Sequence, residues 1–245
     1  MTMTNFSTFK QRSRSLNCRR LLNTVVSPFL KSLTKEVQDA IPQAMLDFHV
    51  SGGFCRGSLV VKRGRGLANV VATLGMLPTE TPKGETATAV SVRSSKCEMS
   101  ASVRWKRFFA PANRLESRWL WNSQRQLAVD SFTYLGISDF AAFGFRLVPI
   151  SWSQYAKEEV ASGMKLDENF EEAQGNDFLG FRHVTEQVWV LGVPLPSELA
   201  LTADGVSMPH RDGRGWFVNV DVTHRLLGQI VSYRGNVRVV DDEVE

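Results

Sequence analysis

The chain has 245 residues, of which 43% are hydrophobic and 22% are charged, enough apolar material for one sizeable core. No run approaches the roughly eighteen apolar residues of a membrane-spanning helix, since the longest candidate, residues 135–152, contains Asp139, Arg146 and Pro149. Three scattered cysteines without a CxxC pair, and four histidines without ligand spacing, argue for a reducing compartment and against structural zinc. The composition predicts a folded domain without a metal, another cofactor or a membrane span.

The net charge of +4 comes from residues 1–26. This segment has no acidic residue and five basic ones, so removing those five charges leaves about −1 for the remainder. An acid-free start rich in Ser, Thr and Arg is typical of a mitochondrial or plastid transit peptide, and a disordered basic tail is the alternative. We expect a cytoplasmic protein unless the segment is a transit peptide. Because the remainder is nearly neutral and has no nucleic-acid-binding module, we expect no nucleic-acid partner.

Helical patterns come first in the folded part. Ser27-Pro28 is a typical helix start, and an apolar stripe then runs to Pro42 and on to His49. A short strand follows at 58–61, and residues 67–77 form a second helical pattern. The apolar residues on one face of that second helix are Leu67, Val70, Val71, Leu74 and Leu77.

The turn before the second helix, Gly64-Arg65-Gly66, invites a phosphate-binding interpretation. The dinucleotide fingerprint fails at its third glycine, where Asn69 stands, and no second strand–helix–strand unit follows. A weaker anion site formed by Lys62, Arg63, Arg65 and the helix N-terminus remains open. The alternative is a solvated loop that turns at its glycines.

From residue 88 onward the sequence is strand-like, with short turns between strands. The predicted strands are 89–92, 99–109, 116–121, 126–134, 143–150, 181–191, 206–210, 216–222 and 229–240. Residues 157–177 carry seven acids against two lysines, which indicates an acidic surface insertion, either a loop or a solvated helix. The whole predicts one α+β domain over 27–240, mainly antiparallel β. We expect a curved sheet or partly closed barrel that packs against the two N-terminal helices.

The last hairpin has the clearest alternation. In its first strand Trp216, Val218, Val220 and Val222 share one face, which we expect to be inward. Asn219 and Asp221 share the opposite face, which we expect to meet water. In the second strand Val231, Tyr233, Val237 and Val239 form the inward set.

A charged residue interrupts the apolar alternation of the 99–109 strand. Trp105, Arg107 and Phe109 share a face, so an inward Arg107 would need an acidic partner, and Asp130 in a neighbouring strand is the candidate. The alternative is an aromatic core strand whose arginine reaches solvent. The candidate ligand-binding residues are Trp105, Arg107, Asp130, Tyr233 and His49.

Several strings resemble, in order and spacing, the family called domain of unknown function 4166. They are residues 41–49, 57–68, 105–108, 117–118, 192–199 with Gly192-Val193-Pro194-Leu195-Pro196, and 227–235. The sequence departs from the family at Asp130, where a Glu is usual, and in the acidic insertion. The family occurs alone or fused behind saccharopine-dehydrogenase-like NAD-binding domains and has no established activity. The resemblance implies a stand-alone copy that lacks the NAD-binding partner, and a separate NAD-binding reductase is one candidate partner.

Two functions remain open. The first is a non-catalytic or accessory module that binds a small apolar or amphipathic ligand in a sheet-lined cavity. The second is an enzyme, or a substrate-handling component, that acts with an NAD-dependent saccharopine-dehydrogenase-like reductase. Convergence of Arg107, Asp130, His49 and Tyr233 on one cavity would favour chemistry, whereas an unbroken apolar lining would favour ligand binding.

Overall fold

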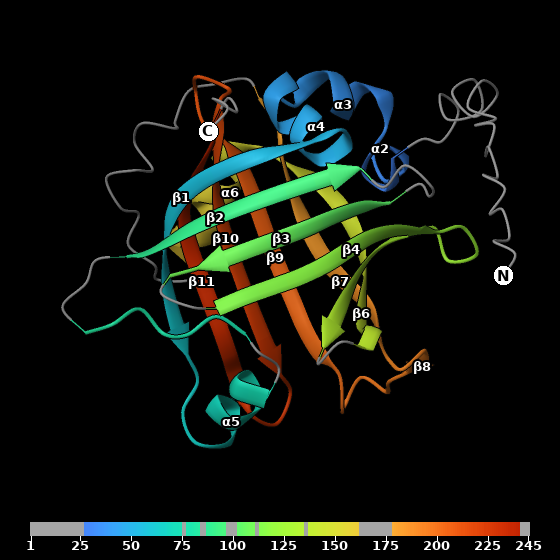
Figure 1. Cartoon of the computed structure of the whole chain (residues 1–245). Helices are drawn as coiled ribbons and strands as arrows, with labels where there is room; N and C mark the ends of the chain where they lie inside the picture. The colour runs from blue at the N-terminus through green and yellow to red at the C-terminus, as the bar shows by residue number, and fades with distance from the viewer. Residues whose placement is uncertain are drawn as a thin grey trace, which may run out of the picture.

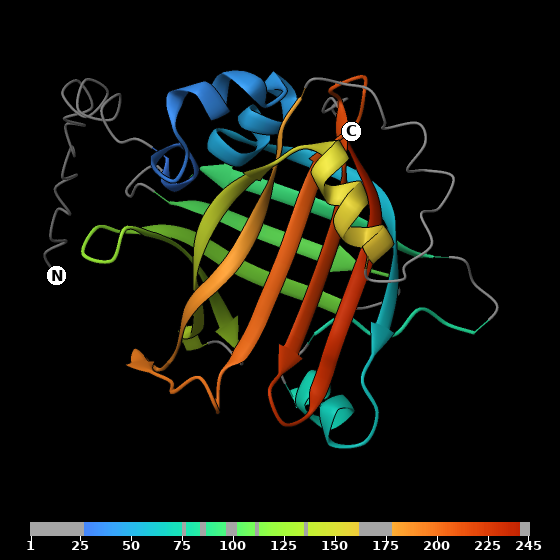
Figure 2. The ribbon, with the colours of Figure 1, turned by 180° about the vertical axis from the view of Figure 1, so that it is seen from behind.

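A closed β-barrel is the centre of the molecule (Figures 1 and 2). The computed structural model describes residues 27–74, 77–83, 87–96, 102–110, 113–134, 137–161 and 178–240. Within these ranges ten antiparallel strands follow one another in the order β6-β5-β4-β3-β2-β1-β11-β10-β9-β7, and the β6–β7 pairing closes the ring. The predicted fold class, α+β with a curved antiparallel sheet, is confirmed. Closure leaves none of these ten strands as an open edge.

The strands alternate in direction around the ring. They are β1 (Gly52–Arg63), β2 (Thr88–Lys96), β3 (Val103–Phe109), β4 (Asn113–Asn122), β5 (Leu127–Tyr134), β6 (Ile137–Ile150), β7 (Gly180–Val190), β9 (Leu201–Pro209), β10 (Gly215–His224) and β11 (Gly228–Val239). A two-residue strand, β8 (Val193–Pro194), pairs with the end of β7.

Strand β1 is much longer than the predicted 58–61. Its glycines look like strand breakers in the sequence, but they allow β1 to run close against β11. A Cβ atom on Gly57 would overlap the carbonyl oxygen of Asn236 on β11. The strand therefore begins at Gly52, and the glycines serve the close approach of two backbones.

Helices lie at the two ends of the barrel (Figure 1). The first end is covered by α2 (Pro28–Lys31), α3 (Lys35–Ala40) and α4 (Gln43–Val50), and we call it the helix-capped end. The second has α5 (Leu67–Leu74) beside β1 and β11, and we call it the α5 end. As predicted, α2 begins at Ser27-Pro28, where the Ser27 hydroxyl accepts a hydrogen bond from the Phe29 N–H.

Helix α5 leaves much of its predicted apolar face exposed. The helix buries Ala68 and Ala72 and exposes Leu67, Val70 and Leu74. The reason is the close approach of the helix to the strand that precedes it. A Cβ atom on Gly64 would lie 2.6 Å from the Cβ of Ala68, so only small side chains fit the contact.

Only the second half of helix α6 (Trp152–Ala161) falls in a segment for which a helix was one alternative, and its first half was not predicted. It lies across the outer face of the barrel (Figure 2). There Trp152 and Tyr155 pack with Met208 of β9 and Phe217 of β10. The prediction that Asn219 meets water is therefore wrong: Asn219 is buried beneath α6, and its Nδ2 donates to the Tyr155 hydroxyl at 3.2 Å. The sequence did contain an indication of this helix, because Trp152 and Tyr155 are three residues apart and therefore share one helical face.

Two predictions concern segments that are described only in part or not at all. Of the acidic insertion 157–177, residues 157–161 belong to α6, and 162–177 lie outside the described residues. The basic segment 1–26 also lies outside them. Its interpretation as a transit peptide or tail stays a prediction. Among the described helices, none has the length and apolar character that crossing a bilayer requires.

Candidate functional site

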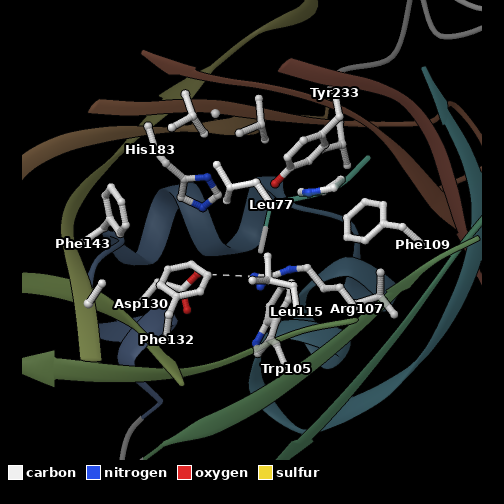
Figure 3. A pocket seen from close by; sticks show the side chains of 18 of the residues that line it. Leu77, Trp105, Arg107, Phe109, Leu115, Asp130, Phe132, Phe143, His183 and Tyr233 are labelled. Carbon is white, nitrogen blue, oxygen red and sulfur yellow. Dashed lines mark hydrogen bonds and ion pairs between the residues drawn. The ribbon is translucent and has the colours of Figure 1, made fainter. Parts of the chain in front are cut away.

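The barrel encloses a cavity of about 500 Å³ (Figure 3). Every strand of the ring contributes at least one inward side chain, and most of these side chains are apolar. Towards the helix-capped end the wall is aromatic, with Phe48, Trp105, Trp119 and Trp216. Towards the α5 end it includes Leu74 and the segment Leu77-Pro78. A cavity of this size is suited to a small organic molecule.

The predicted inward faces of β3 and β10 are confirmed. The cavity wall contains Trp105, Arg107 and Phe109 from β3 and Trp216, Val218, Val220 and Val222 from β10. Their neighbours in sequence point outward because side chains on a strand alternate between the two faces. The inward face of β3 therefore brings a guanidinium group into the barrel.

Arg107 forms the ion pair that the sequence suggested (Figure 3). Its Nη2 lies 3.3 Å from Oδ2 of Asp130, and its Nη1 donates to Oγ of Ser117 at 2.9 Å. The guanidinium also lies 5.0 Å from the ring centroid of Trp105. The side chains of Arg107 and Asp130 are only 13% and 7% exposed, so the arginine is held inside and does not reach out to solvent.

Several polar atoms in this wall have no hydrogen-bond partner among the described residues. They are Oδ1 of Asp130, Nε1 of Trp105, Nε1 of Trp119 and Nε2 of His183. An unsatisfied buried polar group costs about 1–3 kcal/mol, and such groups are rare in folded proteins. A polar group of a bound molecule can satisfy them.

His183 is the site residue that the sequence interpretation missed. It projects from β7 into the cavity, with its ring centroid 5.1 Å from that of Phe181 and 5.4 Å from that of Trp119 (Figure 3). Burial lowers its pKa to about 3, and the positive charges of Arg107 and of a protonated His49 act in the same direction. The imidazole is neutral at pH 7. The sequence did indicate this position, because His183 lies two residues after Phe181 and side chains two residues apart on a strand point to the same face.

His49 lies at the helix-capped end of the cavity. Its Nδ1 is 2.7 Å from the carbonyl oxygen of Met45, and its ring stacks on Phe29 at 4.6 Å between centroids. Burial lowers the pKa to about 4; the hydrogen bond to Met45 opposes this, and Arg107 adds to it. Because a neutral ring needs a proton on Nδ1 to donate to a carbonyl, this hydrogen bond defines the tautomer.

Tyr233 brings a hydroxyl group into the cavity from β11 (Figure 3). Its ring centroid lies 5.9 Å from that of Phe109. Burial raises the pKa of the phenol, while the charge on Arg107 lowers it and that on Asp130 raises it. Tyr233 therefore keeps its proton at neutral pH and can both donate and accept a hydrogen bond.

The predicted anion site divides into two parts. Arg63 is occupied inside the fold, because its Nε donates to the Pro78 carbonyl at 2.7 Å and its Nη1 to Oγ1 of Thr73 at 2.9 Å. It thereby ties the segment after α5 to the helix. Lys62 and Arg65 are exposed and form no ion pair with a described residue. Any anion at this place would meet those two side chains.

Among the described residues, no cluster of three or more His, Cys, Asp or Glu side chains could hold a metal ion. The buried polar groups of the cavity include one compensated ion pair, neutral rings and a phenol, and the exposed Arg114 lies at its α5 end. This set can orient a ligand by hydrogen bonds, and its carboxylate can accept a proton.

The fold and the site define a class: a closed antiparallel β-barrel, helix-capped at one end, with a mainly apolar internal cavity that contains a buried ion pair. No protein-family model and no curated protein matches the chain, so membership of the family of unknown function 4166 stays a prediction. A crystal structure described as an outer membrane lipoprotein-sorting protein domain from Vibrio parahaemolyticus is similar over 86% of this chain and 92% of that chain. The identity is 10% and the TM-score is 0.25, too low to support an argument about fold or function.

Proposed function

We propose that the protein binds one small, mainly apolar molecule with a polar group inside the barrel, as a non-catalytic or accessory module. The observation that carries this proposal is the cavity of about 500 Å³, whose wall is apolar except for a few converging polar side chains. Ligand sites in proteins commonly combine an apolar lining with a few placed polar groups. The apolar wall would hold the body of the ligand by burial.

The polar side chains also constrain the ligand's polar group. The Arg107–Asp130 pair is already compensated, so a charged ligand would bring an uncompensated charge into an apolar wall. Oδ1 of Asp130 can accept a hydrogen bond, and the indole N–H groups of Trp105 and Trp119 can donate. These features favour a neutral ligand that carries a hydroxyl or carbonyl group.

The test is mass spectrometry of small molecules that co-purify with the native full chain. We expect one apolar compound to be retained in native spectra and released by organic solvent. Ala141 and Ala142 are neighbours on β6, and only Ala141 lines the cavity. Ala141→Phe should occupy part of the cavity and weaken retention, whereas Ala142→Phe should retain the compound as the parent does. Equal retention by two folded variants, checked by circular dichroism, would contradict binding in the barrel.

A second candidate is favoured by the convergence of charged and titratable groups. Arg107, Asp130, His49 and Tyr233 all line this cavity, which supports chemistry, whereas its mainly apolar lining supports binding. The candidate is an enzyme, or a substrate-handling component, that acts with a separate NAD-dependent saccharopine-dehydrogenase-like reductase. The reductase as a partner is supported only by the family resemblance. In chemical terms Asp130 is the residue best suited to accept a proton from a bound molecule.

The two candidates differ in what happens to the recovered compound. A binding module returns it with an unchanged mass after incubation, either alone or with NADH and such a reductase. An enzyme changes its mass, and Asp130→Asn should then retain the compound but leave it unconverted. Conversion that continues at the parental rate in Asp130→Asn would exclude this carboxylate as the base.

A further inference from the structure

Large apolar side chains that remain exposed gather at the α5 end of the barrel. Eleven such side chains are exposed in the described residues, and eight of them belong to α5 or to turns and strand ends at this end. The eight are Leu67, Val70, Leu74, Ile137, Leu191, Val193, Leu199 and Leu226. We call them the apolar rim. Single exposed apolar residues are common, but their gathering around one end marks an interaction site.

Helix α5 shows the strongest form of this exposure. Leu67, Val70 and Leu74 are 69%, 50% and 62% exposed, whereas Ala68 and Ala72 are 3% and 0% exposed. A surface helix ordinarily buries its large apolar side chains and exposes its small or polar ones. The inverted arrangement leaves a face of two leucines and a valine directed away from the barrel.

The same end contains the way into the cavity. Leu74 lines the cavity and is also 62% exposed, and the exposed Arg114 at the start of β4 lines it as well. At the opposite end, Phe29 of α2 and Phe48 of α4 are buried in an aromatic cluster with Trp216 of β10. An apolar molecule that leaves the cavity would therefore emerge among the side chains of the apolar rim.

The charge beside the apolar rim is mainly positive, since the exposed acid Glu80 lies near the cation of Arg63. Lys62 at the end of β1 and Arg65 in the turn before α5 are exposed and form no ion pair with a described residue. Arg225 in the β10–β11 turn pairs with Glu198 at 3.5 Å, so that pair is neutral as a whole. Basic side chains next to an exposed apolar helix face are complementary to a lipid surface with negative head groups.

We infer that the α5 end docks on an anionic lipid bilayer, with the apolar rim at the boundary of head groups and acyl chains and with Lys62 and Arg65 on the head groups. The rim comes from five separate segments, namely α5, the start of β6, the β7–β8 turn with β8, the segment before β9 and the β10–β11 turn. A bilayer accommodates such separate tips without a matching pocket for each. Docking is independent of the proposed ligand binding. Passage of a ligand between the bilayer and the cavity rests on the proposed ligand binding.

The experiment is flotation of the full chain with vesicles in a density gradient. The vesicles are phosphatidylcholine alone or phosphatidylcholine with one third phosphatidylserine. We expect the protein to float with the phosphatidylserine vesicles, and less so at high salt because salt screens the head-group charge. Leu67→Ser with Leu74→Ser should lower the partition coefficient by roughly tenfold or more, since two large apolar contacts are lost.

Two further variants separate apolar from electrostatic binding. Val148→Ser with Phe178→Ser removes exposed apolar side chains outside the apolar rim and should leave flotation unchanged. Lys62→Glu with Arg65→Glu should weaken flotation only with phosphatidylserine vesicles. Circular dichroism and the melting temperature of each variant show whether it remains folded.

Several outcomes would overturn the inference. One is the absence of flotation with either vesicle; another is flotation that the Leu67→Ser and Leu74→Ser changes leave unaltered. A concentration-dependent dimer that these changes dissociate would instead assign the apolar rim to a second copy of the chain. The two proposals fail in different ways. If the protein floats normally but carries no retained compound, the docking inference stands and the ligand-binding proposal is wrong.

Discussion

The two ends of the barrel differ in how far their large apolar side chains are buried. At the helix-capped end Phe29, Phe48 and Trp216 are almost completely buried. At the α5 end Leu67 and Leu74 are mostly exposed while alanines fill the contact with the barrel. Burial of apolar area stabilises the fold at the first end. At the second end the same kind of side chain contributes little to folding and is left for an interaction.

The difference follows from how much chain covers each end. Three consecutive helices cover the helix-capped end, and they contact strands on several sides of the ring, including β1, β2, β4 and β10. Among the described residues, the α5 end is covered by one eight-residue helix, which packs on β1 and β11, and by the segment Leu77-Pro78. Because the cavity-lining Leu74 is also exposed at this end, we place the entrance for a ligand here.

The largest contrast should appear on truncating one side chain at each end. Phe29→Ala removes a ring packed against His49, Trp119 and Phe181, and we expect a loss of about 3–5 kcal/mol in the free energy of unfolding. Leu67→Ala at the α5 end should change it by about 0.5 kcal/mol or less. Urea unfolding measures both values, and similar losses would refute the contrast between the ends.

Removal of the Arg107 side chain from the ion pair between the two ends should lower the free energy of unfolding almost as strongly. Arg107→Ala leaves the buried Asp130 carboxylate without its cation, with an expected loss of about 3–5 kcal/mol. Asp130→Asn in the Arg107→Ala background should recover part of this loss, because the stranded charge is gone. A double-mutant cycle without coupling would show that the two side chains act independently.

The buried histidines predict a dependence of stability on pH. Above about pH 6.5 His49 and His183 are neutral in both the folded and the unfolded chain, and the folded pKa values are lowered to about 4 and about 3. As the pH falls below 6.5 the unfolded chain binds protons that the folded chain does not. Stability contributed by the neutral histidines is therefore lost progressively from pH 6.5 downwards.

The measurement is the free energy of unfolding at pH 7 and pH 5. Between these values each histidine should account for a loss of about 2 kcal/mol. His183→Gln should abolish the loss of stability due to His183 and leave the loss due to His49. An identical pH profile for the parent and His183→Gln would contradict a neutral, buried His183.

Asn219→Asp tests the cover that α6 gives to the barrel wall. The Asn219 amide donates to the Tyr155 hydroxyl at 3.2 Å and to Oε1 of Glu159 at 3.4 Å. A carboxylate in its place would face the Glu159 carboxylate and compete with it for the one proton of the Tyr155 hydroxyl, with an expected loss of about 1–3 kcal/mol. Asp221→Asn, two residues along the same strand face, gives the matched control. If Asn219→Asp were neutral, α6 would not seal this face in solution.

The smallest effect is expected at the tip of the β10–β11 turn. Leu226 is exposed, so Leu226→Ser should change the free energy of unfolding by about 0.5 kcal/mol or less while it weakens vesicle flotation. Thermal unfolding and flotation of the same preparation measure the two properties. A clear loss of stability would mean that Leu226 packs within the fold and does not belong to a docking surface.

Much of the barrel wall could be predicted from the sequence because strand alternation is a local property. The two-residue period placed Arg107 beside Trp105 and Phe109, and it placed Tyr233 on the inward face of its strand. The helix start at Ser27-Pro28 was equally readable, since a cap depends on a few adjacent residues. The pairing of Arg107 with Asp130 followed from the cost of leaving a buried cation alone.

What the sequence left undetermined depends on how closely distant segments approach each other. The pattern of α5 showed an apolar face, but only the contact between Gly64 and Ala68 decided that the alanines lie inward. Asn219 looked exposed until α6 was seen to cover its strand. His183 joined the site because β7 closes the ring beside β6 and β9. Periodicity determines which residues share a face, whereas long-range packing decides what that face meets.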